Sequence, residues 1–259
     1  MLRAPGRWLI DEGRRLVSYS ALTVLAVVAL VRRPSEGGAA VRGQVARQVV
    51  FSGWDGVPLV VFFAVMMSVS VVALSATMIP SFEAVGVLGR VLTLVLVREL
   101  APLLTAILII LRSCGAITVE LGNMSWRGEI ESLQTMGIDP AKFLLLPRFI
   151  GLSVAAVALT MVFIVVAALA GLFTAQMFRV APSMSHIVTN VESLLYPGDL
   201  MIALVKSLLF GGTIASIACY HGLAVHADLT EVPRRASRAV VEALSWCTII
   251  GVAITLITL

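Results

Sequence analysis

Three charged residues interrupt otherwise apolar stretches of this sequence: Arg98, Glu99 and Lys206. A charge in the hydrocarbon region of a membrane costs roughly 2.5–3.5 kcal/mol on insertion scales, so such residues face protein or water and pair. We therefore expect Glu99 and Lys206 to form an interhelical pair, which would line a cavity. Arg98 and Glu99 are adjacent, and consecutive helical residues point about 100° apart, so the two do not share one face. The alternative is that all three lie near a membrane surface and anchor helix ends.

The remaining reactive side chains form no catalytic or metal-binding pattern. The histidines are dispersed and are expected in loops or interfaces: His186, His221 and His226. The cysteines lie in or beside apolar stretches without CxxC spacing and are expected to be packed thiols: Cys114, Cys219 and Cys247. The sequence has no GxxxxGK(S/T), HExxH or GxSxG motif. We expect no catalytic residue, no metal and no cofactor in this chain. Such a lack of reactive groups is typical of a protein that acts as a conduit and not as an enzyme on its own.

Composition indicates the setting of these residues. Of the 259 residues, 59% are hydrophobic and 13% are charged, whereas soluble domains carry about a quarter charged residues. The net charge is +4, but the basic residues gather in the termini and loops, which is typical of segments facing cytoplasm and anionic headgroups, not of nucleic-acid binding. The sequence predicts an all-α integral membrane protein.

Five apolar stretches are long enough to cross a bilayer, which takes about twenty residues. They are Val57–Ile79, about Val91–Val119, Phe149–Phe178, Leu200–Tyr220 and Ala239–Leu259. Pro102 removes a helical hydrogen bond in the second stretch and is expected to kink it. These stretches define a five-helix transmembrane domain over residues 57–259.

Residues 1–56 form a separate N-terminal region. Its apolar stretch Leu16–Val31 is short and has an arginine pair at each end, which favours a helix lying in the membrane interface over a sixth span. No small-residue cleavage site follows it, so no signal peptide is expected. With the N-terminus in the cytoplasm, the outer loops hold only Arg90 and Arg179 and the other loop and terminal basic residues lie inside. The C-terminus is then periplasmic.

The polar segment between the second and third spans has its own periodicity. Ile130, Leu133, Gln134 and Gly137 follow the spacing i, i+3, i+4, i+7, which predicts a short surface helix within about residues 125–140, ended by Gly137 and Asp139-Pro140. The alternative is a connector resting on lipid headgroups. Glutamates fit an anionic leaflet poorly, which favours a protein partner.

Two stretches resemble a known family: VRELAPLLTAILIILRSCGAITVELGNM and ESLQTMGIDPAKFLLLPR. They are similar to the MlaE/YrbE permeases, the membrane subunits of MCE-type ABC lipid transporters, whose pattern begins RELGPVLTALL. Gly198-Asp199-Leu200 and Val205-Lys206-Ser207 extend the resemblance, which covers the chain from about residue 40. The chain departs from the family at Ser113-Cys114, where the family has a small residue, and at Glu129-Ile130.

The resemblance implies an interfacial N-terminal helix and five spans in a bacterial inner membrane. It implies a homodimer or a pair of related permeases with a lipid cavity between them. Two ABC ATPase subunits, which hold ATP and Mg²⁺, would dock on one side, and a periplasmic MCE-domain protein on the other. A small STAS-type cytoplasmic subunit is a further partner of such systems.

The resemblance also implies roles for particular residues. The cavity would be lined by Val71, Met78, Ile79, Phe82 and Leu100. The ATPase would be contacted by Arg127, Glu129, Glu131, Leu133, Met136 and Asp139. Glu99 and Lys206 match charged residues near the family's cavity.

The sequence thus predicts the permease subunit of an ATP-driven transporter for phospholipid or a related lipid, such as a sterol or fatty acid. One alternative is an ion-coupled secondary transporter or channel that uses Glu99 and Lys206. Another is a membrane scaffold without cargo. The direction of transport and the identity of the second permease stay open.

Overall fold

The computed structural model describes residues 38–78, 95–177, 197–225 and 230–258. The stretch Leu16–Val31 lies outside these residues, and so do Ile79 and Phe82. Within the described part every regular element is helical. The all-α prediction is confirmed.

Five helical stretches are long and apolar enough to cross a membrane, as predicted: Gly43–Leu74, Val95–Trp126, Phe143–Met177, Gly198–Leu223 and Glu231–Thr258. The first comprises most of α2 (Gly38–Ser52), a 3-10 turn η1 (Trp54–Gly56) and α3 (Val57–Met78). Helix α2 thus precedes the apolar stretch expected at Val57–Ile79 and is continuous with it. The third, fourth and fifth spans are built around α8 (Leu146–Met177), α10 (Pro197–Leu223) and α11 (Glu231–Thr258).

The second span alternates between π-helical and α-helical turns. It runs through η2 (Val95–Leu100), α5 (Ala101–Ile109), η3 (Ile110–Cys114) and α6 (Gly115–Trp126). Pro102 stands in the first turn of α5, directly after the π-helical turn, because a proline gives no N–H to the preceding turn. The sequence predicted that this span ends near Val119, but the helix continues to Trp126. Glu120 and Asn123 end the apolar stretch, but polar residues can continue a helix beyond the hydrocarbon region.

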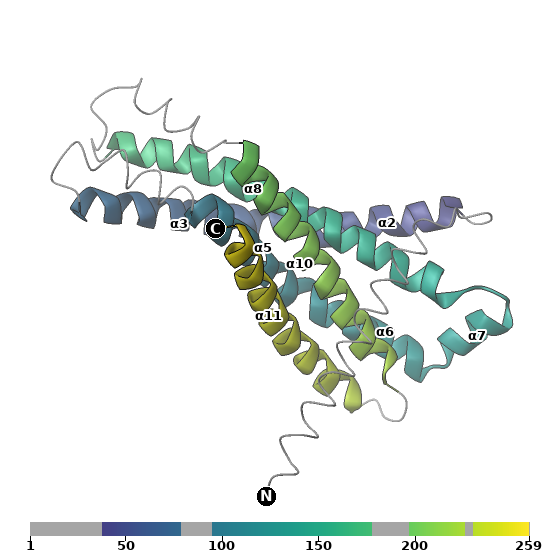
Figure 1. The fold of residues 1–259 in the computed structure, drawn as a ribbon. Helices are drawn as coiled ribbons and strands as arrows, with labels where there is room; N and C mark the ends of the chain where they lie inside the picture. The colour runs from purple at the N-terminus through teal and green to yellow at the C-terminus, as the bar shows by residue number, and fades with distance from the viewer. Residues whose placement is uncertain (1–37, 79–94, 178–196, 226–229, 259) are drawn as a thin grey trace, which may run out of the picture.

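Helix α10 lies at the centre of the bundle and packs against α8, α6 and α11 (Figure 1). Small residues permit this close packing. A Cβ added at Gly211 would lie 2.6 Å from Ser153 Cα of α8, and one added at Gly222 would lie 2.5 Å from Leu121 Cβ of α6. A hydroxyl pair, Thr105 and Thr160 at 2.8 Å, also joins α5 to α8.

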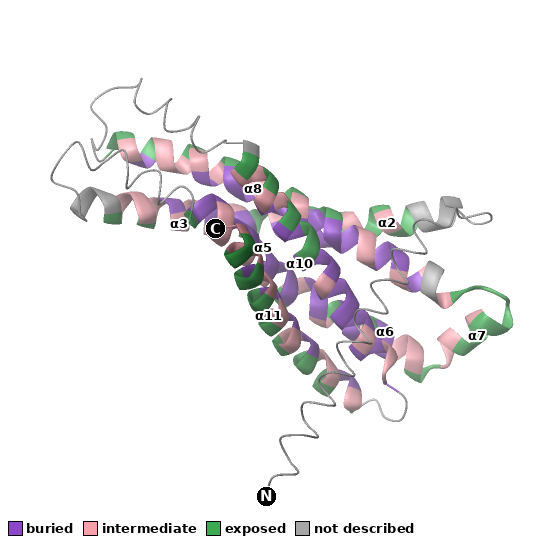
Figure 2. Ribbon diagram, in the orientation of Figure 1, coloured by how far each residue is buried: buried purple, intermediate pink, exposed green. Residues whose placement is uncertain are grey.

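Burial is uneven among the spans (Figure 2). The second span, α8 and α10 carry most of the buried core, whereas α3 and α11 keep large apolar side chains exposed along much of their length, among them Phe62, Leu74, Val252 and Leu256. Exposed apolar surface of this extent is compatible with hydrocarbon or another apolar partner, not with water. The fold is that of a membrane-embedded bundle.

Candidate functional site

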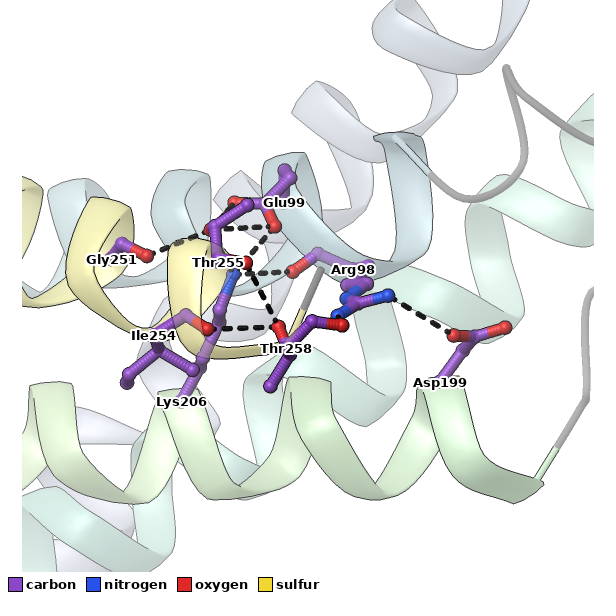
Figure 3. A network of polar contacts seen from close by, with 8 residues as sticks. All are labelled: Arg98, Glu99, Asp199, Lys206, Gly251, Ile254, Thr255 and Thr258. Carbon is purple, nitrogen blue, oxygen red and sulfur yellow. Dashed lines mark hydrogen bonds and ion pairs between the residues drawn. The ribbon is translucent and has the colours of Figure 1, made fainter.

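The ammonium group of Lys206 is the centre of a polar network inside the bundle (Figure 3). Its side chain is only 1% exposed. The Nζ atom lies 2.6 Å from Glu99 Oε1, 2.9 Å from Thr255 Oγ1 and 3.4 Å from the Arg98 carbonyl oxygen. An ammonium group has three N–H donors, so each has an acceptor. The Glu99–Lys206 pair is therefore present, and the charged end of Lys206 lies inside the bundle.

One of these contacts lies close to Pro102 in the sequence. Lys206 donates to the Arg98 carbonyl, and Pro102, four residues further on, has no N–H that could compete for it. A buried charge of the fourth span thus uses a backbone acceptor of the second.

Arg98 forms a second set of contacts beside the first. Its Nη2 atom donates to the Thr258 carbonyl at 2.6 Å, and Nη1 lies 3.8 Å from Asp199 Oδ1. Thr258 belongs to the last described turn of α11. Arg98 therefore contacts this turn of α11 through its backbone.

Adjacent residues of η2 thus contact the same two helices at different levels. Arg98 contacts Asp199 of α10 and Thr258 of α11, whereas Glu99 contacts Lys206 of α10 and Thr255 of α11. Residues 199 and 206 are seven positions apart and therefore lie on one face of α10. Two cations and two carboxylates alternate, so their formal charges cancel. This arrangement ties the second span to the fourth and fifth.

Sequence reasoning identified three charges of this network, Arg98, Glu99 and Lys206, but neither Asp199 nor the hydroxyl partners. The Thr255 hydroxyl accepts a hydrogen bond from Lys206. It lies 2.9 and 3.0 Å from the two carboxylate oxygens of Glu99 and 2.8 Å from the Gly251 carbonyl oxygen. Its single proton is donated to one of these three oxygens. The spacing of Thr255 and Thr258, three residues apart at the end of the last span, was the available signal. Only the fold shows that these threonines meet Arg98 and Glu99.

The expected cavity residues are described only in part. Val71 is half-buried and packs against the core, and Leu100, next to Glu99, is half-buried at the end of η2. The side chain of Met78, like residues Ile79 and Phe82, lies outside the described part. A lipid-lining role for this set stays a prediction.

The polar segment between the second and third spans folds as a hairpin-like projection. Helix α6 continues through Trp126, the chain turns at Gly128 with φ of +70°, and α7 covers Glu129–Thr135. The predicted helix over about 125–140 is therefore shorter, because Gly128 breaks it. Gly137, with φ of +77°, ends α7 as expected. The N–H of Gly137 donates to the Gln134 carbonyl, and the N–H of Ile138 donates to the Leu133 carbonyl. These are the two hydrogen bonds of a Schellman motif.

Helix α7 projects away from the bundle and has no buried residue (Figure 1). Its half-buried side chains Ile130 and Leu133 pack toward the core, as the predicted amphipathic spacing requires. Met136 is 65% exposed, and Ile138 is exposed beside it. The charged residues expected to contact an ATPase are exposed or half-exposed: Arg127, Glu129, Glu131 and Asp139. The projection thus combines uncovered apolar side chains with carboxylates.

The remaining reactive groups of the described part are packed within the bundle. All three cysteines are free and buried. His221 Nε2 of α10 lies 2.9 Å from Glu242 Oε2 of α11, so this histidine belongs to a helix interface. No group of three or more potential metal ligands occurs within the described ranges.

The MlaE permease family model matches residues 45–257. This chain belongs to the MlaE permease family. The match includes both the polar network and the projection around α7. It confirms the resemblance carried by the stretch from Arg98 to Arg148.

Several relatives are named as transporter permeases. A probable ABC transporter permease protein of Rickettsia felis is 27% identical over 238 residues, which cover 92% of this chain and 89% of the relative. A probable ABC transporter permease protein of Synechocystis is 32% identical over 164 residues, covering 63% of this chain and 62% of the relative. The intermembrane phospholipid transport system permease protein MlaE of Haemophilus influenzae is 27% identical over 162 residues, covering 62% of each chain.

Proposed function

We propose that this chain is the transmembrane permease subunit of an ATP-driven ABC transporter that moves phospholipid or a related lipid between the inner membrane and the outer envelope. The observation that carries the proposal is the projection around α7 on a five-span bundle of the MlaE family. The chain has no P-loop, so the energy of ATP must enter from a partner. The projection offers that partner an apolar tip rimmed with carboxylates.

The surroundings of the chain follow from this assignment. ABC ATPase subunits that hold ATP and Mg²⁺ contact Arg127, Glu129, Glu131, Leu133, Met136 and Asp139 in the cytoplasm. A second permease copy completes the lipid cavity, and an MCE-domain protein receives or delivers lipid on the periplasmic side. A STAS-type subunit is a further cytoplasmic partner. The N-terminus is cytoplasmic and the C-terminus periplasmic, as the distribution of basic residues predicts.

Transport requires that the bundle have two states with different affinity for lipid. ATP binding displaces the projection, and this displacement opens or narrows the apolar cavity. The polar network fixes the second, fourth and fifth spans to one another, so we assign it a structural role beside the cavity. This assignment gives the ion-coupled alternative less support, because every donor of Lys206 is engaged and its side chain is buried.

Purification and reconstitution test the proposal. The tagged chain is extracted from its native membrane in mild detergent, and co-purifying proteins and lipids are identified by mass spectrometry. The recovered complex is then placed in liposomes with a fluorescent phospholipid. We expect an ATPase and an MCE-domain protein to accompany the chain, and lipid transfer to require ATP. Transfer that proceeds without an ATPase and responds to an ion gradient would support the secondary-transporter alternative instead.

A further inference from the structure

A buried arginine lies where the projection rejoins the bundle. Arg148, in the first turn of α8, has a side chain that is 7% exposed. Its Nη2 atom lies 2.9 Å from Glu120 Oε1 of α6, and its Nη1 atom donates to the Leu144 carbonyl at 3.3 Å. Leu144 belongs to η4 (Ala141–Leu145). One guanidinium group therefore contacts α6 and, one turn earlier in its own helical stretch, the carbonyl of η4.

Both stems of the projection pack on α10, and each has further neighbours of its own. Helix α6 packs on α10 and α11, whereas α8 packs on α10, α3, α2 and α5. Helix α7 itself contacts α6 and has no buried residue. A force on α7 therefore enters the bundle through α6 on one side and through η4 and α8 on the other. The ion pair Glu120–Arg148 joins these two stems.

We propose that Arg148 is a positioning residue that, with Glu120, clamps the base of the projection. The clamp makes α6, η4 and the start of α8 move together when the ATPase displaces α7. Deeper in the bundle, the Thr105–Thr160 hydroxyl pair joins the same two spans, twelve residues along α8 or roughly 18 Å from Arg148. The two spans are thereby linked at two levels, and a displacement at α7 reaches the membrane region without separating them. This inference rests on the proposed function, in which α7 receives the ATPase.

The clamp predicts a loss of coupling without a loss of assembly. The test uses the complete transporter in liposomes and measures co-purified ATPase, ATP hydrolysis and fluorescent lipid moved per ATP. For Arg148→Gln, Glu120→Gln and the double variant, we expect the complex to assemble and hydrolyse ATP. Lipid moved per ATP falls by about tenfold, within the roughly 5–150-fold range typical of coupling between sites. Because the residues act as one pair, the double variant loses no more than either single variant.

A matched control separates the clamp from a general need for ion pairs in this span. Arg112 Nη2 of η3 lies 2.9 Å from Asp55 Oδ2 of η1, but this pair does not join the stems of the projection. The double variant Arg112→Gln/Asp55→Asn is therefore expected to keep its lipid-per-ATP ratio. The double clamp variant also avoids the unpaired buried charge that Glu120→Gln leaves on Arg148, so it folds even where the single variant does not.

Each outcome decides the proposal. A double clamp variant that moves as much lipid per ATP as the wild type overturns the clamp and leaves the proposed function standing. Losses that multiply between the single variants, or an equal loss in the Arg112/Asp55 control, also overturn it. A wild-type complex that hydrolyses ATP and moves no lipid overturns the proposed function, and the clamp with it.

Discussion

The polar network and the projection place side chains in opposite ways. The network holds charged groups inside the bundle, where apolar residues are usual, and the projection holds Met136 and Ile138 in the open, where polar residues are usual. In the network each of the four ionised groups has a partner of opposite charge or an uncharged acceptor. The apolar side chains of the projection's tip have no comparable cover within the described residues.

This difference separates internal stability from external binding. A buried ion pair with its hydrogen bonds completed needs no ligand, and its removal is felt by the fold. An exposed apolar tip contributes little to the fold and gains free energy only when another surface covers it. The network is therefore expected to respond to substitution through stability, and the projection through partner binding.

Glu99→Leu has the largest expected effect on stability. It leaves the ammonium group of Lys206 buried without its carboxylate, which costs about 3–5 kcal/mol. The double variant Glu99→Leu/Lys206→Met removes both charges and is expected to recover most of this loss. Unfolding in detergent can be followed with a thiol-reactive dye, because all three cysteines are buried in the folded chain. A double variant as unstable as Glu99→Leu alone would argue against the ion pair as the source of the effect.

Sequence reasoning identified Arg98, Glu99 and Lys206 as residues of interest but did not predict the geometry of the network. Hydropathy makes Arg98, Glu99 and Lys206 conspicuous, since each is costly in a membrane. Which helix each one meets depends on how α10 and α11 cross. A Cβ added at Gly251 of α11 would lie 3.3 Å from Phe210 Cζ of α10, so this glycine permits their close packing. The adjacency of Arg98 and Glu99 predicted that the two would not share one face. In the structure both contact α10 and α11, at different levels.

Thr255→Val has the next largest expected effect on the free energy of unfolding. It keeps the shape of the side chain but removes the hydroxyl that contacts both Lys206 and Glu99, so the free energy of unfolding is expected to fall by about 1–3 kcal/mol. Thr248→Val is a matched control on the same helix. Both hydroxyls contact the carbonyl four residues earlier, at 2.8 Å, but Thr248 is exposed and lies outside the network. Equal losses in the two variants would show that the network adds nothing to this hydroxyl.

The boundaries of the projection show a second limit of the sequence. Periodicity correctly placed Ile130 and Leu133 toward the core and Gly137 at the end of α7. It did not separate α6 from α7, because Ser125 and Trp126 fit a helix as well as Glu129 does. The separation depends on Gly128, whose left-handed conformation is compatible with glycine at little cost.

Gly128→Ala tests this turn and is expected to have a smaller effect. An added Cβ meets no atom within 4 Å, so the cost comes from the φ of +70° alone and amounts to about 1–2 kcal/mol. Local opening of α7 should rise by a factor of about 5–30, measured by hydrogen exchange of its amides. Gly43→Ala in α2 is the control, since its Cβ is also unobstructed and a helical alanine stabilises by roughly 0.5–1 kcal/mol. Unchanged exchange in α7 would exclude Gly128 as the hinge between α6 and α7.

Met136→Ser is expected to change the free energy of unfolding least, within about 0.5 kcal/mol, because the side chain is already exposed. If the tip is covered by the ATPase, the same change weakens ATPase binding by about tenfold, as for an apolar anchor worth more than 1 kcal/mol. Gln134→Ser, at an exposed polar position of α7, should change neither quantity. Titration of the purified ATPase onto each permease variant in nanodiscs measures the binding. A Met136→Ser variant with a lower free energy of unfolding but normal ATPase binding would contradict the contrast between the two regions. The tip of the projection would then contribute to stability and not to partner binding.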